Sequence, residues 1–185
     1  MPRTPTFQIS LYLTNRAALL VGSGPIAENR DQRLRAAGAT VTWVSADDYR
    51  SDMCAHKFLV AAADDDETCN ERVAADALAA GCLRYVHDRP ALSDFAMPAL
   101  IKRGPLTLAI STDGAAPALS RVVRERLEQL IASGGDELDQ LIAELEALRQ
   151  SLPKGQRGPE LYRLASRFRI DGTLAIEPAA ESESD

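Results

Sequence analysis

The stretch VGSGPIA (residues 21–27) decides the fold that we expect for the first part of the chain. It follows the apolar run AALL (17–20) and precedes the charged segment ENRDQRLRAAGA (28–39). A strand, then Gly-x-Gly-x-x-Ala, then a helix is the sequence context of dinucleotide binding. Gly22 would permit the tight turn, Gly24 would let a pyrophosphate approach the backbone, and Ala27 would let the helix pack on the strand. A strand–helix turn without any ligand is the alternative.

Outward from this turn, strand and helix patterns alternate along the first half of the chain. Apolar or β-branched runs predict strands, and two segments with helical starts and glycine stops predict helices. This alternation predicts a parallel sheet with covering helices, an α/β fold of Rossmann-like type. The expected strands are 7–13, 17–24, 40–45, 57–63, 83–88 and 105–112, and the expected helices are 25–38 and 64–81.

The character of the sequence changes after about residue 115. Segments 116–133, 136–152 and 158–168 carry apolar residues at helical spacing. We therefore predict a Rossmann-like NAD-binding domain over 1–112 and a helical domain, with a dimerisation role, over 113–172. The polar, acidic residues 173–185 predict a disordered tail.

Composition excludes several classes of function. The net charge of -6 in 185 residues argues against a general nucleic-acid binder. No apolar run reaches the roughly 18 residues that a membrane span needs, and the first residues lack the apolar core of a signal peptide. The 3 cysteines are odd in number and show no metal-ligand or redox spacing, so we expect reduced thiols in a cytoplasmic protein.

The acidic residue that usually holds the ribose of NAD is missing from its expected place. It normally follows the second strand, about 20 residues after the glycine turn. Here that strand ends at Val44 and Ser45, and Asp47 and Asp48 come slightly later. We interpret these two aspartates as loop charges, and the choice between NAD and NADP stays open.

The segment 83–121 is a more specific indicator of function than the glycine turn. It contains RYVHDRP (84–90), FAMPALIKRGPLTLAIST (95–112) and DGAAPALSR (113–121). Together with the glycine turn and AAADDDETCN (61–70), these motifs resemble, in order and spacing, the precorrin-2 dehydrogenase / sirohydrochlorin ferrochelatase family, the N-terminal module of siroheme synthase. The resemblance covers about residues 7–170.

The resemblance implies both a fold and a chemistry. It implies a homodimer with a Rossmann-like NAD-binding domain, a dimerisation segment and a small helical domain. It implies oxidation of precorrin-2 to sirohydrochlorin with NAD⁺, and in some members insertion of Fe²⁺ as a substrate, with no resident metal site. The tetrapyrrole substrate carries carboxylates, for which arginine is well suited.

The resemblance also implies which residues form the site. Asp88 matches the family's key aspartate and would accept a proton once burial raises its pKa. His87 would point to the opposite face of the strand and stay outside the pocket. The implied cofactor-binding residues are Gly22, Gly24, Pro25, Ile26, Val41, Thr42 and Asp64, and the implied substrate-binding residues are Arg89, Lys102, Arg103, Ser111 and Arg121. A basic surface would also draw on Arg84, Arg124 and Arg126.

Four departures from the family pattern are visible. Ala116 replaces a serine, Asn29-Arg30 replaces an Arg-Lys pair, and Asp64 replaces a threonine. The segment between Trp43 and Phe58 is roughly twenty residues shorter than the resemblance leads us to expect. Two alternatives to a dehydrogenase therefore remain: a tetrapyrrole-binding or chelatase protein without NAD-dependent oxidation, and an NAD(H)-sensing regulatory module.

Overall fold

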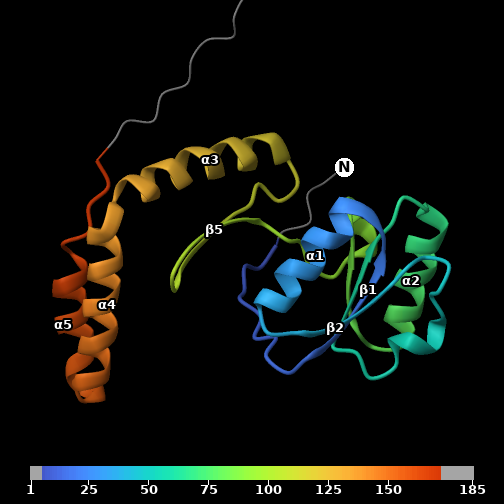
Figure 1. Ribbon diagram of the computed structural model, residues 1–185, viewed down its shortest axis with the longest axis horizontal. Helices are drawn as coiled ribbons and strands as arrows, with labels where there is room; N and C mark the ends of the chain where they lie inside the picture. The colour runs from blue at the N-terminus through green and yellow to red at the C-terminus, as the bar shows by residue number, and fades with distance from the viewer. Residues whose placement is uncertain (1–5, 172–185) are drawn as a thin grey trace, which may run out of the picture. The chain divides into compact units, whose positions relative to one another are not determined.

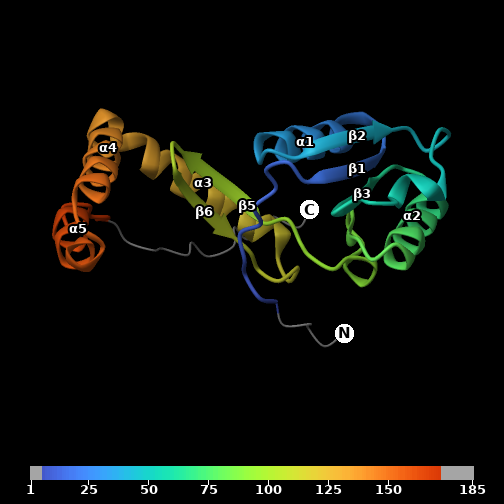
Figure 2. The same ribbon diagram turned by 90° about the horizontal axis from the view of Figure 1, so that it is seen from below.

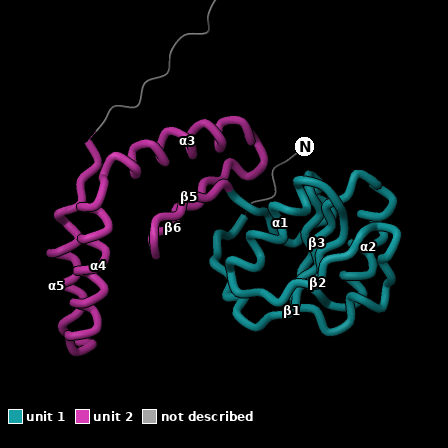
Figure 3. The backbone as a smooth tube through the Cα atoms, in the orientation of Figure 1, with its two compact units in different colours: residues 1–98 teal, residues 99–185 magenta. Residues whose placement is uncertain are grey.

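The computed structural model describes residues 6–171 and divides the chain into two compact units at Pro98 (Figure 3). Figure 1 colours the helices and strands of both units by their position along the chain. The first unit contains β1 (Ala17–Gly22), α1 (Gly24–Ala36), β2 (Thr40–Val44), β3 (Leu59–Ala63), α2 (Glu67–Ala79) and β4 (Leu83–Val86). The second contains β5 (Ala99–Arg103), β6 (Leu106–Ile110), α3 (Pro117–Ser133), α4 (Gly135–Ser151) and α5 (Arg157–Ala165).

The first unit is a four-stranded parallel sheet in the order β2-β1-β3-β4. Helix α1 connects β1 to β2, and α2 connects β3 to β4. The connection from β2 to β3 holds only a short 3-10 turn, Ser51–Cys54, which is where the sequence is short. Parallel pairing brings the carboxyl ends of all four strands to one edge, the usual ligand edge of such sheets. The predicted α/β Rossmann-like class is confirmed.

Strand periodicity explains how the sheet divides its side chains between the two helices. In β1, Leu19 and Val21 are buried in the core that includes α2, whereas Ala18 and Leu20 are buried in the core that includes α1. Successive side chains of a strand point to opposite faces, so a strand covered on both sides must be apolar throughout. Figure 2 shows α1 and α2 on either side of the strands.

The second unit is built around an antiparallel hairpin, β5–β6, whose register pairs Ile101 with Leu108. Its core joins Ile101 to Ile131 and Leu138 of the helices. Leu106 and the other inward residues of β6 pack against the same cluster. In residues 6–171, no helix is both long and apolar enough to cross a membrane.

Three expectations are corrected by the structure. Residues 7–13 form no strand: Leu13 packs into the core, but Phe7 and Ile9 are exposed, so the alternation is not used in a sheet. Strand β5 was missed, because a short apolar run such as 95–101 cannot be told from a core segment by pattern alone. The boundary lies at 98/99 instead of 112, since the hairpin shares its core with α3 and α4. The predicted tail, 173–185, lies outside the described residues.

Candidate dinucleotide and substrate site

Gly22 ends β1 opposite Ala63 of the neighbouring strand β3. Its φ is +137°, and a Cβ at this position would lie 2.2 Å from the backbone oxygen of Ala63 in β3. Such a contact cannot exist, so any side chain here would force the strands apart. The first glycine is therefore required by packing within the sheet as well as by the turn.

Gly24 opens helix α1 and faces free space. Its φ is +75°, and a Cβ built on it would meet no atom within 4 Å. Ser23, the N-cap residue, makes no side-chain hydrogen bond to the first turn. Ala27 is fully buried against the sheet, as the motif predicts. The first turn of α1 thus presents uncapped backbone N–H groups beside an open backbone, the arrangement that accepts a phosphate.

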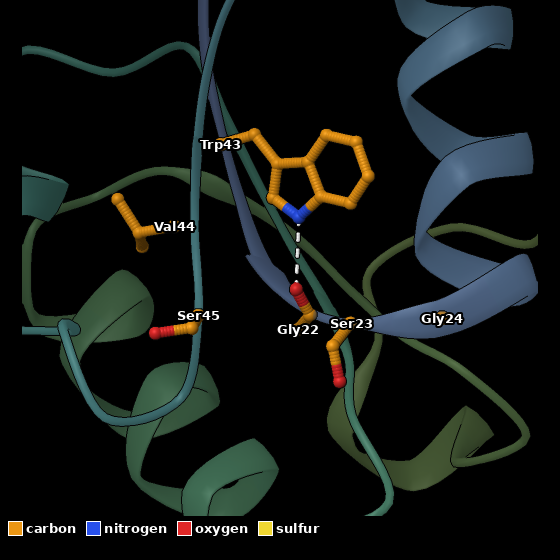
Figure 4. Close-up of a pocket in the computed structure, with 6 residues that line it drawn as sticks. All are labelled: Gly22, Ser23, Gly24, Trp43, Val44 and Ser45. Carbon is orange, nitrogen blue, oxygen red and sulfur yellow. Dashed lines mark hydrogen bonds between the residues drawn. The ribbon is translucent and has the colours of Figure 1, made fainter.

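An open depression of about 310 Å³ borders this turn, lined by Gly22, Ser23, Gly24, Trp43, Val44 and Ser45 (Figure 4). The indole of Trp43 stands beside the bend, and its Nε1–H donates a hydrogen bond of 2.8 Å to the Gly22 oxygen (Figure 4). Trp43 is 39% exposed, so much of the ring is available to a ligand. Sequence analysis did not assign Trp43 to the site, although a lone tryptophan at a strand end was a signal.

The cofactor contacts predicted on the second strand lie earlier in the sequence than the residues that line the depression. Val41 is buried in the core beneath α1, and Thr42 accepts a hydrogen bond from Lys57. The register pairs Val41 with Ala18, deep in β1, so neither Val41 nor Thr42 lines the depression beside the bend. Trp43, Val44 and Ser45 occupy that place.

Asp64 lies directly at the bend, following β3. Its carboxylate accepts hydrogen bonds from the Ser23 hydroxyl at 3.3 Å and from the Asp66 N–H at 3.0 Å. Its own backbone N–H and C=O are held by the buried side chain of Asn70. Asp66 caps α2 by accepting from Thr68 N–H. The structure therefore fixes an acidic group beside the glycine turn, where the family pattern has a threonine.

The two aspartates after β2 differ in their surroundings. Asp48 accepts a hydrogen bond of 2.7 Å from the Ser45 hydroxyl, and its N–H donates back to the same oxygen. Asp47 lines a separate depression that also contains Arg72. Asp48 thus closes the turn after the strand, and Ser45 lines the depression beside the bend.

Asp88 stands in the turn after β4, with a left-handed backbone (φ +53°) and a side chain that is 89% exposed. The expected burial of its carboxylate is absent within this unit. The prediction that His87 points away from Asp88 is wrong: its Nε2 lies 3.6 Å from Asp88 Oδ2. Alternation holds only within a strand, and β4 ends at Val86.

The predicted basic surface is largely neutralised by acids of the protein itself. Arg89 pairs with Glu67 and Glu71 in the first unit. Arg103 binds both oxygens of Asp139 and the carbonyls of Ile131 and Gly135, so it joins the hairpin to the helices of the second unit. These contacts give Arg103 a structural role in the second unit, and its role in substrate binding stays a prediction. Arg84, Arg121 and Arg124 pair with Asp94, Glu125 and Glu128 respectively.

The remaining predicted substrate residues lie in the second unit. Lys102 is exposed on β5. The Ser111 hydroxyl accepts from the Asp113 N–H and closes the turn after β6. Ala116, where the family pattern has serine, is the N-cap of α3 without a capping side chain. The Thr112 hydroxyl accepts a hydrogen bond of 3.1 Å from the Ala116 N–H, just before the helix.

The site residues fit a dinucleotide at its phosphates. The open backbone of Gly24 and the uncapped start of α1 would hold the pyrophosphate, and the Trp43 ring with Ser45 would border the adenosine half. No cluster of three or more His, Cys, Asp or Glu able to hold a metal ion occurs among residues 6–171. Fold and bend together define the class: a Rossmann-like NAD(P)-binding protein.

Comparison with known proteins agrees with this class. Residues 9–99 match a family model described as putative NAD(P)-binding, and residues 103–130 match one described as the central part of a sirohaem biosynthesis protein. The siroheme synthase of Psychrobacter sp. (strain PRwf-1) is 33% identical over 198 aligned positions, covering 96% of this chain. The siroheme synthase of Tolumonas auensis is 40% identical over 136 positions, covering 64% of this chain and 29% of the relative.

A solved structure, SirC, precorrin-2 dehydrogenase, is similar to the chain with a TM-score of 0.67 and 25% identity. The match covers 86% of this chain and 89% of SirC. Over most of its length the chain is therefore similar to the N-terminal module of siroheme synthase and to SirC.

Two further facts concern the alignment with the Psychrobacter enzyme. The chain spans 41% of the length of the Psychrobacter enzyme. The 198 aligned positions exceed the 185 residues of the chain, so the relative has residues in the matched region that have no counterpart here. The second fact agrees with the short connection between β2 and β3.

Proposed function

We propose that the protein is an oxidoreductase that dehydrogenates precorrin-2 to sirohydrochlorin with NAD⁺, within siroheme biosynthesis. The open glycine bend of the first unit is the observation that carries the proposal, because it combines a backbone free of side chains with an uncapped helix start. The likeness to SirC, a precorrin-2 dehydrogenase, over 86% of the chain supports this choice of reaction.

The reaction removes one hydride and one proton from the macrocycle. A bound NAD⁺ supplies the hydride acceptor. Asp88 is our candidate for the proton acceptor, because it is the carboxylate at the carboxyl end of β4 and its exposed position lets it meet a substrate. Binding of a flat macrocycle over Asp88 would remove water from it and supply the desolvation that the free protein lacks.

The macrocycle bears carboxylates, and the proposal assigns part of their binding to the second unit. Lys102, Ser111 and Arg121 stay assigned to this role. Lys102 is exposed, and the side chain of Arg121 is 79% exposed although it lies 3.1 Å from Glu125. An exposed ion pair of this kind is weak enough to exchange partners when a ligand arrives.

We also propose a homodimer in the cytoplasm. Leu119, Val122 and Leu130 are exposed and lie on one face of α3, which suits a contact with a second copy. The three cysteines are free and buried, as expected where thiols stay reduced. Sedimentation of the full chain measures the dimer, and a monomer at every concentration would refute it. Any Fe²⁺ would enter as a substrate.

Anaerobic incubation of the protein with precorrin-2 and NAD⁺ tests the proposal. We expect the absorbance of sirohydrochlorin to appear in step with NADH. Asp88→Asn should lower kcat by about a hundredfold or more, because asparagine keeps the left-handed backbone but cannot accept the proton at neutral pH. Asp52→Asn, at an exposed position, is the matched control.

Two results would contradict parts of this account. Unchanged turnover in Asp88→Asn would remove Asp88 from the mechanism. Binding of sirohydrochlorin without any NAD⁺-dependent oxidation by the wild-type protein would instead support a tetrapyrrole-binding or chelatase protein.

A further inference from the structure

Two arginines of α1 have no role in the reaction described so far. Arg30 and Arg33 are three residues apart and therefore lie on the same side of the helix, and both are half-buried. The guanidinium of Arg30 lies 5.3 Å from the centre of the Tyr85 ring. That of Arg33 donates a hydrogen bond of 3.1 Å to the Pro98 carbonyl. The face of α1 that carries them is thus turned toward β4 and the segment that follows it.

None of the side chains that contact these two arginines in residues 6–171 is a carboxylate. Arg30 contacts the Asn29 side-chain oxygen at 2.8 Å and His87 Nδ1 at 3.5 Å, and its buried Nε has no hydrogen-bond partner in the described part of the chain. Neither Arg30 nor Arg33 forms an ion pair with a carboxylate of residues 6–171. By contrast, five of the predicted substrate-site or basic-surface arginines are paired with acids: Arg84, Arg89, Arg103, Arg121 and Arg124.

Such an arrangement is unfavourable in the absence of an anion. Burial lowers the pKa of Arg33, and the neighbouring charge of Arg30 lowers it further. Two partly desolvated cations side by side repel one another, and an orphaned buried N–H adds to the cost. A bound carboxylate would offset the repulsion between the two cations, because a guanidinium fork binds both of its oxygens.

The position of the pair points to the substrate instead of the cofactor. His87 contacts Arg30 through Nδ1, and its Nε2 lies 3.6 Å from Asp88. A guanidinium can only donate, so the hydrogen-bond network assigns the His87 proton to Nε2, facing the Asp88 carboxylate. Arg30 is therefore linked through one side chain to the proposed proton acceptor. The phosphates of a dinucleotide have their own place at Gly24, at the start of the same helix.

We propose that Arg30 and Arg33 form a binding subsite for a carboxylate of the substrate, next to Asp88. The proposal rests on the proposed function in one respect, that the substrate is a polycarboxylated tetrapyrrole. The subsite fixes one edge of the macrocycle, and His87 positions the Asp88 carboxylate beside it.

The test uses the full chain and the variants Arg30→Gln and Arg33→Gln. Arg35→Gln is the matched control, since Arg35 lies on the same helix and is already paired with Asp31 at 2.7 Å. Sirohydrochlorin binding is titrated by absorbance under anaerobic conditions, and KM and kcat are measured with precorrin-2. Emission of Trp43 reports dinucleotide binding separately.

We expect each test variant to bind sirohydrochlorin about tenfold more weakly, as loss of one charge-assisted contact implies. KM should rise more than kcat falls, dinucleotide binding should be unchanged, and the urea midpoint should be equal to or above that of the wild type. Arg35→Gln should bind sirohydrochlorin normally.

Wild-type affinity in both test variants would overturn the subsite while leaving the proposed function intact. A lower urea midpoint with unchanged affinity would show that the arginines serve the fold and would equally overturn it. If the wild-type protein neither binds sirohydrochlorin nor oxidises precorrin-2, the proposed function fails and the subsite fails with it.

Discussion

Two glycines with nearly the same backbone conformation occupy very different places in the first unit. Gly24 has φ +75° and opens α1 beside the depression, whereas Gly81 has φ +72° and follows the end of α2. A Cβ on either would meet no atom within 4 Å. Their intrinsic strain on substitution is therefore the same, but only Gly24 adjoins the proposed pyrophosphate site.

This pair gives a matched prediction. Gly24→Ala and Gly81→Ala should each lower the free energy of unfolding by about 1–2 kcal/mol, the cost of a side chain in the left-handed region. Only Gly24→Ala should also weaken NAD⁺ binding, by about tenfold, because its methyl group would enter the space of the pyrophosphate. Urea unfolding and calorimetric titration with NAD⁺ measure the two effects. Equal NAD⁺ affinity in the two variants would argue against a pyrophosphate at Gly24.

At the scale of elements, Asp94 anchors the segment after β4, which carries Asp88, to Arg84 of that strand. Asp94 binds the Arg84 guanidinium at 2.8 Å and accepts from the Arg84 backbone N–H at 2.9 Å. These bonds to Arg84 hold the pKa of Asp94 below its usual range. A carboxyl whose pKa is lowered on folding stabilises the folded state above its unfolded pKa, about 4, and loses that effect as the pH falls through the lower, folded value.

Asp94→Asn should therefore destabilise the protein by about 1 kcal/mol at neutral pH, since one charge-assisted bond is replaced by a neutral one. The difference from the wild type should shrink as the pH falls below the unfolded value of about 4 and through the lowered pKa of Asp94, because the unmodified carboxyl then becomes protonated itself. Urea midpoints of both proteins across this range measure it. A difference that persists unchanged in acid would mean that the Asp94 charge contributes nothing.

Helices and strands were predicted best where the hydrophobic periodicity agreed with the residues that begin and end such elements. Strands β1 to β4 and helices α1 and α2 lie close to their expected ranges, because each apolar run ends at a glycine, an acidic cap or a polar loop. The hairpin was harder. Its strands have five residues each, and the turn at Gly104 and Pro105 was visible only as a basic loop.

At the scale of the whole molecule, the second unit forms a core of its own from the hairpin and helices α3 and α4. This core could not be predicted from sequence, because the partner of Ile101 is Ile131, thirty residues further along the chain. The same limit applies to the site. Motifs indicated Gly22, Gly24, Asp64 and Asp88, but only the fold brings Trp43 to the bend and Arg30 to His87.

Long-range ion pairing was equally invisible in the sequence. Arg103 stands in the basic turn of the family pattern, yet its partner Asp139 is in α4. The count of basic residues in a segment therefore says little about charge available to a ligand. Arg30 and Arg33, which form no ion pair with a carboxylate of residues 6–171, lie outside the motif that suggested a basic surface.

The central claim is that a dinucleotide binds at the bend between β1 and α1, and the protein carries its own reporter there. Trp43 is its only tryptophan, and its ring is hydrogen-bonded to Gly22. Titration of the full chain with NADH should give a saturable fall in Trp43 emission, with energy transfer to the nicotinamide. Added NAD⁺ should compete with NADH and reverse this fall. An emission that stays unchanged at millimolar dinucleotide, together with no heat in calorimetry, would contradict the account.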